Sequence, residues 1–158
     1  MTSLTELEHA ILETLAYSDI FEFPLRLEEV HRYLPVRAAM DEVRKGLSRA
    51  KQVDSRDGYY FLAGHEEYVE MRARRADASL PAFNWALRYG RILGSMPFVR
   101  MVGMTGSLAM MNLSEGADMD YMLVTKPGRL WTARAFAVSF GRLMRPFRHR
   151  ICVNLLVS

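Results

Sequence analysis

The spacing of apolar and polar residues over positions 1 to 64 predicts three helices followed by a β-hairpin. Apolar residues recur at helical intervals in three stretches, which Pro24 and Pro35 separate. The third stretch starts at Val36, so we expect its helix to begin there. Asp57-Gly58 is a strong hairpin-turn signal, and an aromatic run follows it.

Residues 65 to 95 have the pattern of a helical connector. Pro81 lies inside this stretch, so we expect it to kink the helix or to start a second helix at its first turn. Trp85, Tyr89 and Leu93 recur at i, i+4 and i+8, which favours a place for all three in the core. A binding role for Trp85 is the alternative.

The pattern changes between residues 96 and 158, where short apolar runs alternate with helical stretches. "PFVRMVGM" is typical of a buried strand, and a turn in "TGSLAMMN" opens a short helix. "ADMDYMLVT" predicts a second strand, a helix follows Pro127-Gly128, and the near-continuous apolar run "RICVNLLVS" predicts a third strand in a covered sheet. This alternation makes a mixed α/β layer, and we expect the whole chain to be of the α+β class.

Three helices followed by a hairpin is the order of a winged helix-turn-helix, and we assign residues 1 to 64 to such a module. In that fold the third helix can enter a DNA major groove while the hairpin contacts the backbone. Asp41 and Glu42 interrupt the basic face of this helix, so a docking or packing role competes with DNA binding. The candidate nucleic-acid contacts are the neighbouring basic residues Arg37, Arg44, Lys45, Arg49 and Lys51.

Composition narrows the class of protein. A chain of 158 residues, half of them hydrophobic, can bury a core, and no apolar run approaches the roughly 18 residues that span a membrane. The acidic N-terminus predicts no signal peptide. Cys152 is the single cysteine, which excludes an internal disulfide and a cysteine-based zinc cluster and favours the cytoplasm. The last predicted strand reaches the end of the chain, so we expect a minimal or shortened core.

Charge is distributed unevenly along the chain. Seven basic residues and no acidic residue lie between Tyr121 and Ser158, so of the net charge of +3 the first 120 residues carry −4. A basic C-terminal segment that follows a pair of acidic residues favours binding of an anionic substrate through a metal ion. A solvated helix face with a basic loop explains the same pattern. The seven residues are Lys126, Arg129, Arg134, Arg142, Arg145, Arg148 and Arg150.

Two aspartates on a predicted strand are the main candidates for chemistry. Asp118 and Asp120 lie at i and i+2, so they project from the same side and repel each other unless a cation lies between them. Magnesium prefers such hard oxygen ligands. Gly106 and Ser107 precede them at a helix start, where backbone N–H groups can bind phosphate. An idle acidic turn and a simple helix cap are the alternatives, but the ordered combination favours a site.

The Gly106-Ser107 turn, followed by Asp118 and Asp120, resembles the signature of the DNA polymerase β-like nucleotidyltransferase superfamily over residues 96 to 158. "YSDIFEFPLRLEEVHRYL", taken with "TGSLAM" and "CVNLLV", looks like a bacterial group with an N-terminal winged helix. The resemblance implies transfer of a nucleoside monophosphate from an NTP to a hydroxyl. It implies that the two aspartates hold Mg²⁺ (or Mn²⁺) and that the turn binds the triphosphate.

The sequence departs from that superfamily at one position. A later strand usually supplies a third carboxylate, and the matching strand here carries Asn154 instead. An amide is neutral and cannot act as a base, but it can ligate a metal or hydrogen-bond a nucleotide. Two functions therefore stay open: a nucleotidyltransferase, or a non-catalytic module that senses a nucleotide and binds DNA or a protein. Asn154 as an ordinary strand residue is the structural alternative.

Overall fold

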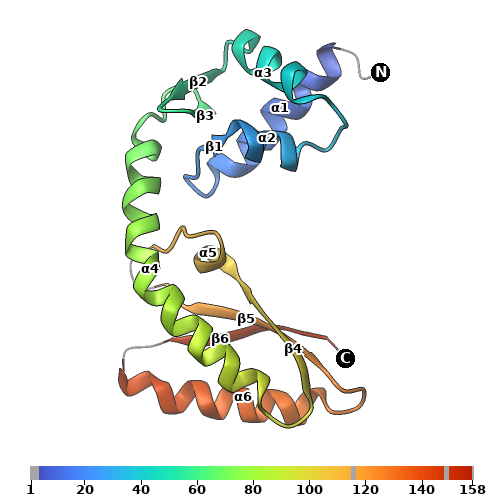
Figure 1. The fold of residues 1–158 in the computed structure, drawn as a ribbon, viewed down its shortest axis with the longest axis vertical. Coiled ribbons are helices and arrows are strands. Elements are labelled where there is room, and N and C mark those ends of the chain that lie inside the picture. The colour runs from blue at the N-terminus through green and yellow to red at the C-terminus, as the bar shows by residue number, and fades with distance from the viewer. Residues whose placement is uncertain (1–3, 115–116, 148–149, 158) are drawn as a thin grey trace. The chain divides into compact units, whose positions relative to one another are not determined.

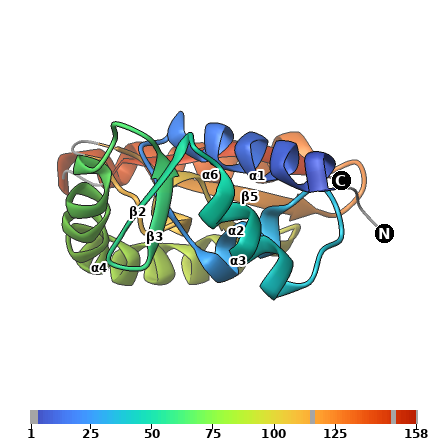
Figure 2. The ribbon, with the colours of Figure 1, turned by 90° about the horizontal axis from the view of Figure 1, so that it is seen from above.

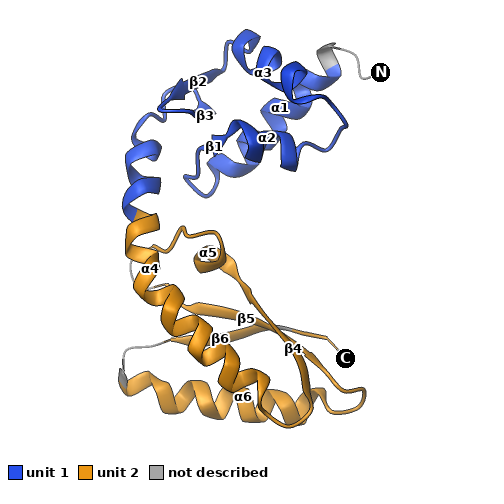
Figure 3. Ribbon diagram, in the orientation of Figure 1, with its two compact units in different colours: residues 1–74 blue, residues 75–158 orange. Residues whose placement is uncertain are grey.

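The computed structural model describes residues 4–114, 117–147 and 150–157, and the chain divides into two compact units, residues 1–74 and 75–158 (Figure 3). Helices and strands occur in both units, which confirms the predicted α+β class. In the described part of the chain, no helix combines the length and the apolar character needed to cross a membrane.

The first unit consists of three helices and a three-stranded antiparallel sheet in the order β1-β3-β2. The hairpin turn forms at Asp57-Gly58, where both residues have positive φ, as the sequence predicts. α1 packs against α3 and β3 (Figure 1 and Figure 2). The elements are α1 (Leu4–Asp19), β1 (Leu25–Arg26), α2 (Leu27–Tyr33), α3 (Met40–Arg49), β2 (Val53–Arg56) and β3 (Tyr59–Leu62).

The start of α3 differs from the prediction. The helix begins at Met40, and Val36 lies in the preceding loop. The Glu42 carboxylate accepts a hydrogen bond of 2.7 Å from the Ala39 N–H, which caps the helix at that point. Apolar side chains from all three helices and from the segment before α2 then form one core, made of Leu7, Ile11, Leu15, Phe23, Leu25, Leu27, Val30, Val43 and Leu47.

The predicted connector is one continuous helix, α4 (Glu67–Gly94), which carries the boundary between the units. Pro81 lies inside it and starts no second helix, although its missing N–H costs one backbone hydrogen bond. Tyr89 and Leu93 are buried as predicted, but Trp85 is 42% exposed. Each step of four residues rotates by about 40° around a helix, so the i, i+4, i+8 row drifts off the core face.

The second unit contains a mixed three-stranded sheet in the order β4-β5-β6. β4 and β5 are antiparallel, whereas β5 and β6 are parallel and α6 connects them. The predicted order of strands and helices is therefore correct. The elements are β4 (Val99–Thr105), α5 (Gly106–Ala109), β5 (Met119–Thr125), α6 (Leu130–Met144), the 3₁₀ turn η1 (Arg145–Phe147) and β6 (Ile151–Val157).

Successive side chains of strand β5 alternate between a packed face of the sheet and a more open one. Met119, Tyr121 and Leu123 are buried in a core with residues of α4 and α6, and the Tyr121 hydroxyl donates to the Ala86 carbonyl at 2.7 Å. Asp120 and the other alternate residues of β5 are half-buried on the opposite face.

The prediction that β4 is a buried strand and that the sheet is covered was wrong. Met101 on β4 is 48% exposed, and Val157 on β6 is 44% exposed. Both strands lie at an edge of the sheet, and α4 and α6 contribute their buried side chains to the core on only one of its faces. An outer strand with one covered face leaves alternate side chains in contact with solvent.

A partly buried ion pair links α2 and α4 within the first unit. The Arg72 guanidinium contacts both oxygens of Glu29, at 2.7 and 2.8 Å, and lies 3.9 Å from the centre of the Phe23 ring. Burial opposes ionisation of Glu29, but the hydrogen bonds from Arg72 and from the Arg26 N–H lower its pKa overall.

We expect Glu29→Gln to lower the free energy of unfolding by about 1.5–3 kcal/mol at neutral pH, because a hydrogen bond to a charged group is lost. A lowered pKa gives stability above the ordinary pKa of glutamate, and that stability is lost as pH falls through the folded-state pKa. The difference in the free energy of unfolding between the wild type and Glu29→Gln should therefore become smaller in acid. Urea unfolding of the wild type and of the variant checks this, with exposed Glu28→Gln as the control. A difference in the free energy of unfolding that does not change with pH would contradict a stabilising role of ionised Glu29.

Candidate nucleotide site

The bend between β4 and α5 approaches a carboxylate of the neighbouring strand very closely. Gly106 begins α5 with φ of +69°, a conformation that favours glycine. A Cβ at this position would overlap Oδ2 of Asp120 and lie 3.1 Å from its Cγ. Gly106 itself is exposed to solvent. Only glycine therefore lets this bend lie directly against the aspartate.

Strand register places Asp120 at the centre of the sheet. In the antiparallel pair Asp120 lies opposite Thr105, the residue before the bend, and in the parallel pair it lies opposite Cys152. Residues paired across strands share a face of the sheet. The carboxylate therefore has the Gly106 bend on one side and β6 on the other.

Asn154 completes the surroundings of this carboxylate. The β5–β6 register shifts after Tyr121, and Asn154 is the extra residue of the resulting bulge. Its Nδ2 donates to Oδ1 of Asp120 at 2.6 Å, and its Oδ1 accepts from the Cys152 thiol at 2.7 Å. Bulges often re-aim a side chain beside a site. Cys152 was missed as a neighbour, and only its place opposite Asp120 in the register identifies it.

Asp118 lies just before β5, not on the strand as the sequence predicted. Its side chain is 43% exposed and one oxygen is 4.0 Å from the Arg150 guanidinium. The Met119 N–H donates to the Arg150 carbonyl at 2.7 Å, and this hydrogen bond ties the start of β5 to the segment before β6. The exposed ion pair stabilises little by itself. Asp118 is therefore open to a ligand.

The two aspartates and the thiol affect one another electrostatically. Burial raises the pKa of Asp120, the Asn154 hydrogen bond lowers it, and the charge of Asp118 raises it again, with a net increase. Burial also raises the pKa of Cys152, and both aspartates raise it further, while Arg134 opposes them. Asp118 and Asp120 are two residues apart in the chain, and a cation between their carboxylates would relieve this repulsion.

The donor set fits a hard divalent cation. Asp118 and Asp120 offer carboxylate oxygens, and Mg²⁺ typically combines one or two carboxylates with water and substrate phosphates. Among the described residues, no group of three or more His, Cys, Asp and Glu side chains is arranged to hold a metal. Remaining ligands for Mg²⁺ would therefore come from water and phosphate. The amide oxygen of Asn154 already accepts the Cys152 hydrogen bond.

The structure brings together Gly106, Asp120 and Asn154, with Asp118 beside them. Ser107 follows Gly106 in α5, and its carbonyl accepts from the N–H groups of Met110 and Asn112, which fixes the short helix behind the bend. The predicted Gly-Ser bend, Asp120 and Asn154 thus lie together in the second unit, on the short helix and the strands that the sequence predicts, while Asp118 lies just before β5.

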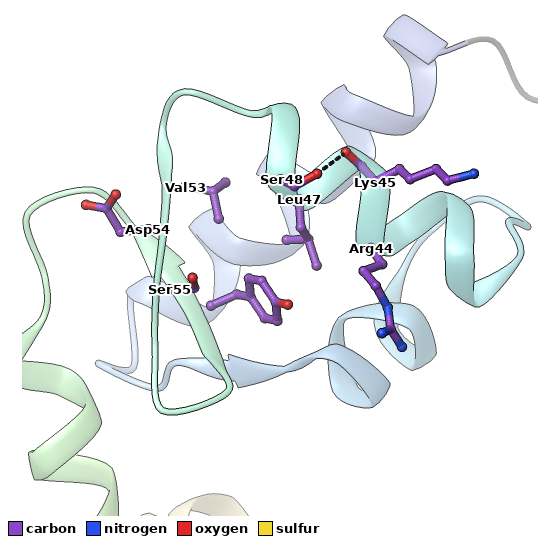
Figure 4. A pocket seen from close by; sticks show the side chains of 8 residues that line it. Arg44, Lys45, Leu47, Ser48, Val53, Asp54 and Ser55 are labelled. Atoms are coloured by element: carbon purple, nitrogen blue, oxygen red, sulfur yellow. Dashed lines mark hydrogen bonds between the residues drawn. The ribbon is translucent and has the colours of Figure 1, made fainter.

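The basic residues predicted to contact nucleic acid belong to the first unit. All are exposed, and they lie on α3 or in the loops beside it. A pocket of about 670 Å³ lies between α3 and the hairpin, and its lining includes Arg44 and Lys45 of α3 and Val53 and Ser55 of β2 (Figure 4). Asp54 also lines this pocket, so it contains both signs of charge. The five residues are Arg37, Arg44, Lys45, Arg49 and Lys51.

No protein-family model, curated protein or solved structure matches this chain.

We expect Gly106→Ala to destabilise the chain by more than the roughly 1 kcal/mol that a left-handed alanine costs. The excess arises because the new methyl group displaces the Asp120 carboxylate. Gly128→Ala is the matched control, since Gly128 has φ of +71° and nothing within 4 Å of its added Cβ. In an Asp120→Ala background the excess should largely disappear. Chemical unfolding of the four variants measures this coupling, and equal losses at the two glycines would exclude the close approach.

We expect Asp120→Asn to be more stable than the wild type at neutral pH. The raised pKa means that the folded chain holds this proton more tightly than the unfolded chain does, so stability falls as pH rises through the ordinary aspartate range to the folded-state pKa. The advantage of the variant should vanish in acid. Thermal unfolding over pH checks this, with exposed Asp54→Asn as the control. A less stable variant at neutral pH would be the opposite of the expected result.

Proposed function

We propose that the second unit is a magnesium-dependent nucleotidyltransferase, which transfers a nucleoside monophosphate from an NTP to a hydroxyl group. One observation carries the proposal: the Asp120 carboxylate lies against the Gly106 bend, with Asp118 two residues before it in the chain. The resemblance to the DNA polymerase β-like superfamily requires this juxtaposition of an acidic pair and a phosphate-binding turn. An idle acidic loop requires no such contact.

Each residue has a defined role in this proposal. Asp118 and Asp120 hold Mg²⁺ (or Mn²⁺), which when bound neutralises phosphate charge and favours ionisation of the acceptor hydroxyl. Backbone N–H groups of Gly106 and Ser107 bind the phosphates, because glycine permits close approach of the chain. Asn154 holds Oδ1 of Asp120 by its 2.6 Å hydrogen bond and so orients the carboxylate.

The reaction is an in-line displacement at the α-phosphorus. The acceptor oxygen forms a new P–O bond, the bond between the α-phosphorus and its bridging oxygen breaks, and pyrophosphate leaves with that electron pair. The hydroxyl proton passes to water, since Asn154 is neutral and cannot take it. Positioning and charge neutralisation therefore supply the catalysis.

A second candidate function is non-catalytic nucleotide sensing. The observation that favours it is the amide of Asn154 on Asp120, where the resemblance implies a third carboxylate. Without a base at this position, the site can bind an NTP and transmit its presence with no turnover.

The first unit is proposed to be a winged helix-turn-helix. Its helices, its hairpin and the additional strand β1 support this reading. Arg37, Arg44, Lys45, Arg49 and Lys51 are the proposed nucleic-acid contacts, while Asp41, Glu42 and Asp54 support docking to a protein. The cytoplasm is the proposed location, in accord with the single cysteine.

We expect NTP with Mg²⁺ to raise the melting temperature of the wild type, and neither to do so alone. Ligand at about 100 times its Kd adds about 2.7 kcal/mol to the free energy of unfolding. The double variant Asp118→Ala/Asp120→Ala should lose this shift. The control Asp41→Ala/Glu42→Ala removes the same charge from the first unit and should keep it. A shift that survives loss of Asp118 and Asp120 refutes the site.

Transfer of label from an α-labelled NTP to an acceptor separates the enzyme from the sensor. The proposed enzyme labels the acceptor and releases pyrophosphate, whereas the sensor shows the thermal shift without either product. We expect Asn154→Asp to increase transfer, because a carboxylate there can accept the hydroxyl proton. No labelled product from the wild type or from this variant, with every NTP and with pools of nucleic-acid, protein and small-molecule acceptors, would favour the sensor.

A further inference from the structure

The outer surface of α6 carries a basic stripe to which the proposed transfer reaction assigns no role. With about 100° of rotation per residue, Arg134, Arg142 and Arg145, the residue that directly follows α6 and keeps a helical backbone, project within about 80° of one another around the helix axis. Trp131 projects from the same sector and is 76% exposed. The buried side of α6, made of the small residues Ala133, Ala137 and Gly141, is centred about 100° around the helix from the centre of this sector. We call Trp131, Arg134, Arg142 and Arg145 the α6 stripe.

The α6 stripe has no acidic counterpart. Residues 121 to 158 contain no Asp or Glu, and no ion pair between described residues involves its three arginines. The Arg134 guanidinium lies 5.9 Å from the centre of the Trp131 ring, within cation–π range. The stripe therefore presents positive charge and an aromatic face side by side to the solvent.

We propose that the α6 stripe is a binding site for single-stranded nucleic acid. Its arginines bind phosphates, to which a guanidinium donates two parallel hydrogen bonds, and Trp131 stacks on an unpaired base. The inference goes beyond the proposed transfer reaction, and it holds whether or not that reaction occurs.

Two other anionic partners fit the surface less well. A helix that lies on a membrane inserts its apolar face into lipid. The other large exposed apolar residues of α6, Phe136 and Leu143, project about 100° or more away from every residue of the stripe, so the stripe itself has no apolar face to insert. Duplex DNA offers phosphates but keeps its bases paired, so it cannot use the exposed ring of Trp131. A single strand can bind the arginines through its phosphates and can stack an unpaired base on Trp131.

Fluorescence anisotropy with labelled oligo-dT and oligo-U of about 12 nucleotides tests this site, in the full chain and without NTP. We expect Trp131→Ala to weaken binding about tenfold, the effect of losing one stacked base, and Trp131→Phe to keep most of the affinity. Arg134→Ala/Arg142→Ala/Arg145→Ala should reduce the slope of log affinity against log salt by about 2. All four positions are exposed, so the variants should fold.

The control variant Arg74→Ala/Arg91→Ala/Arg100→Ala removes the same charge from exposed positions to which no binding role is assigned, and it should keep the affinity for single strands. The proposal is overturned if the control variant loses binding while the α6 variants keep it. It is also overturned if neither oligonucleotide binds, if the α6 variants weaken binding of a duplex as much as binding of the single strand, or if only phosphatidylserine vesicles bind. Because no NTP is present, failure of the transfer reaction leaves this test unaffected.

Discussion

The second unit depends on the close approach of one carboxylate to one bend. Asp120 can lie against Gly106 only because glycine has no Cβ and adopts a positive φ. The antiparallel pairing of β4 with β5 sets this approach, because it places Thr105 opposite Asp120. Backbone amides that can bind phosphate and a carboxylate that can bind a cation are thereby brought to one place. The proposed chemistry follows from that proximity.

The carboxylate is held at an energetic cost. Partial burial and the charge of Asp118 both disfavour ionised Asp120, and the Asn154 hydrogen bond offsets this only in part. Hydrophobic packing elsewhere in the unit, including Tyr121 and Leu123 on the other face of β5, supplies the stability that such a site requires. An acidic pair that a fold retains against electrostatic repulsion is typical of a site where a cation or substrate completes the balance.

Local signals predicted much of this structure. Gly106, Asp118, Asp120 and the alternation along β5 could be identified because turn chemistry and strand period depend on neighbouring residues. The contact of Asn154 with Cys152 and Asp120 could not, since a bulge between β5 and β6 sets that register. The exposure of β4 depends on which face of the sheet the helices cover. Trp85 lies outside the core because the row of residues at i, i+4 and i+8 rotates around α4. Helix α3 begins later in the sequence than predicted because the Glu42 carboxylate caps it.

Binding of Mn²⁺ tests the central claim most directly, because electron paramagnetic resonance distinguishes the free ion from the bound ion. With a non-hydrolysable NTP, which itself chelates Mn²⁺, the account predicts that the wild type reduces the free-ion signal below the level set by the nucleotide alone and that Asp118→Ala/Asp120→Ala does not. The control Asp41→Ala/Glu42→Ala should behave like the wild type. Equal Mn²⁺ binding by the wild type and by the variant without Asp118 and Asp120 would contradict a metal–nucleotide site at the Gly106 bend.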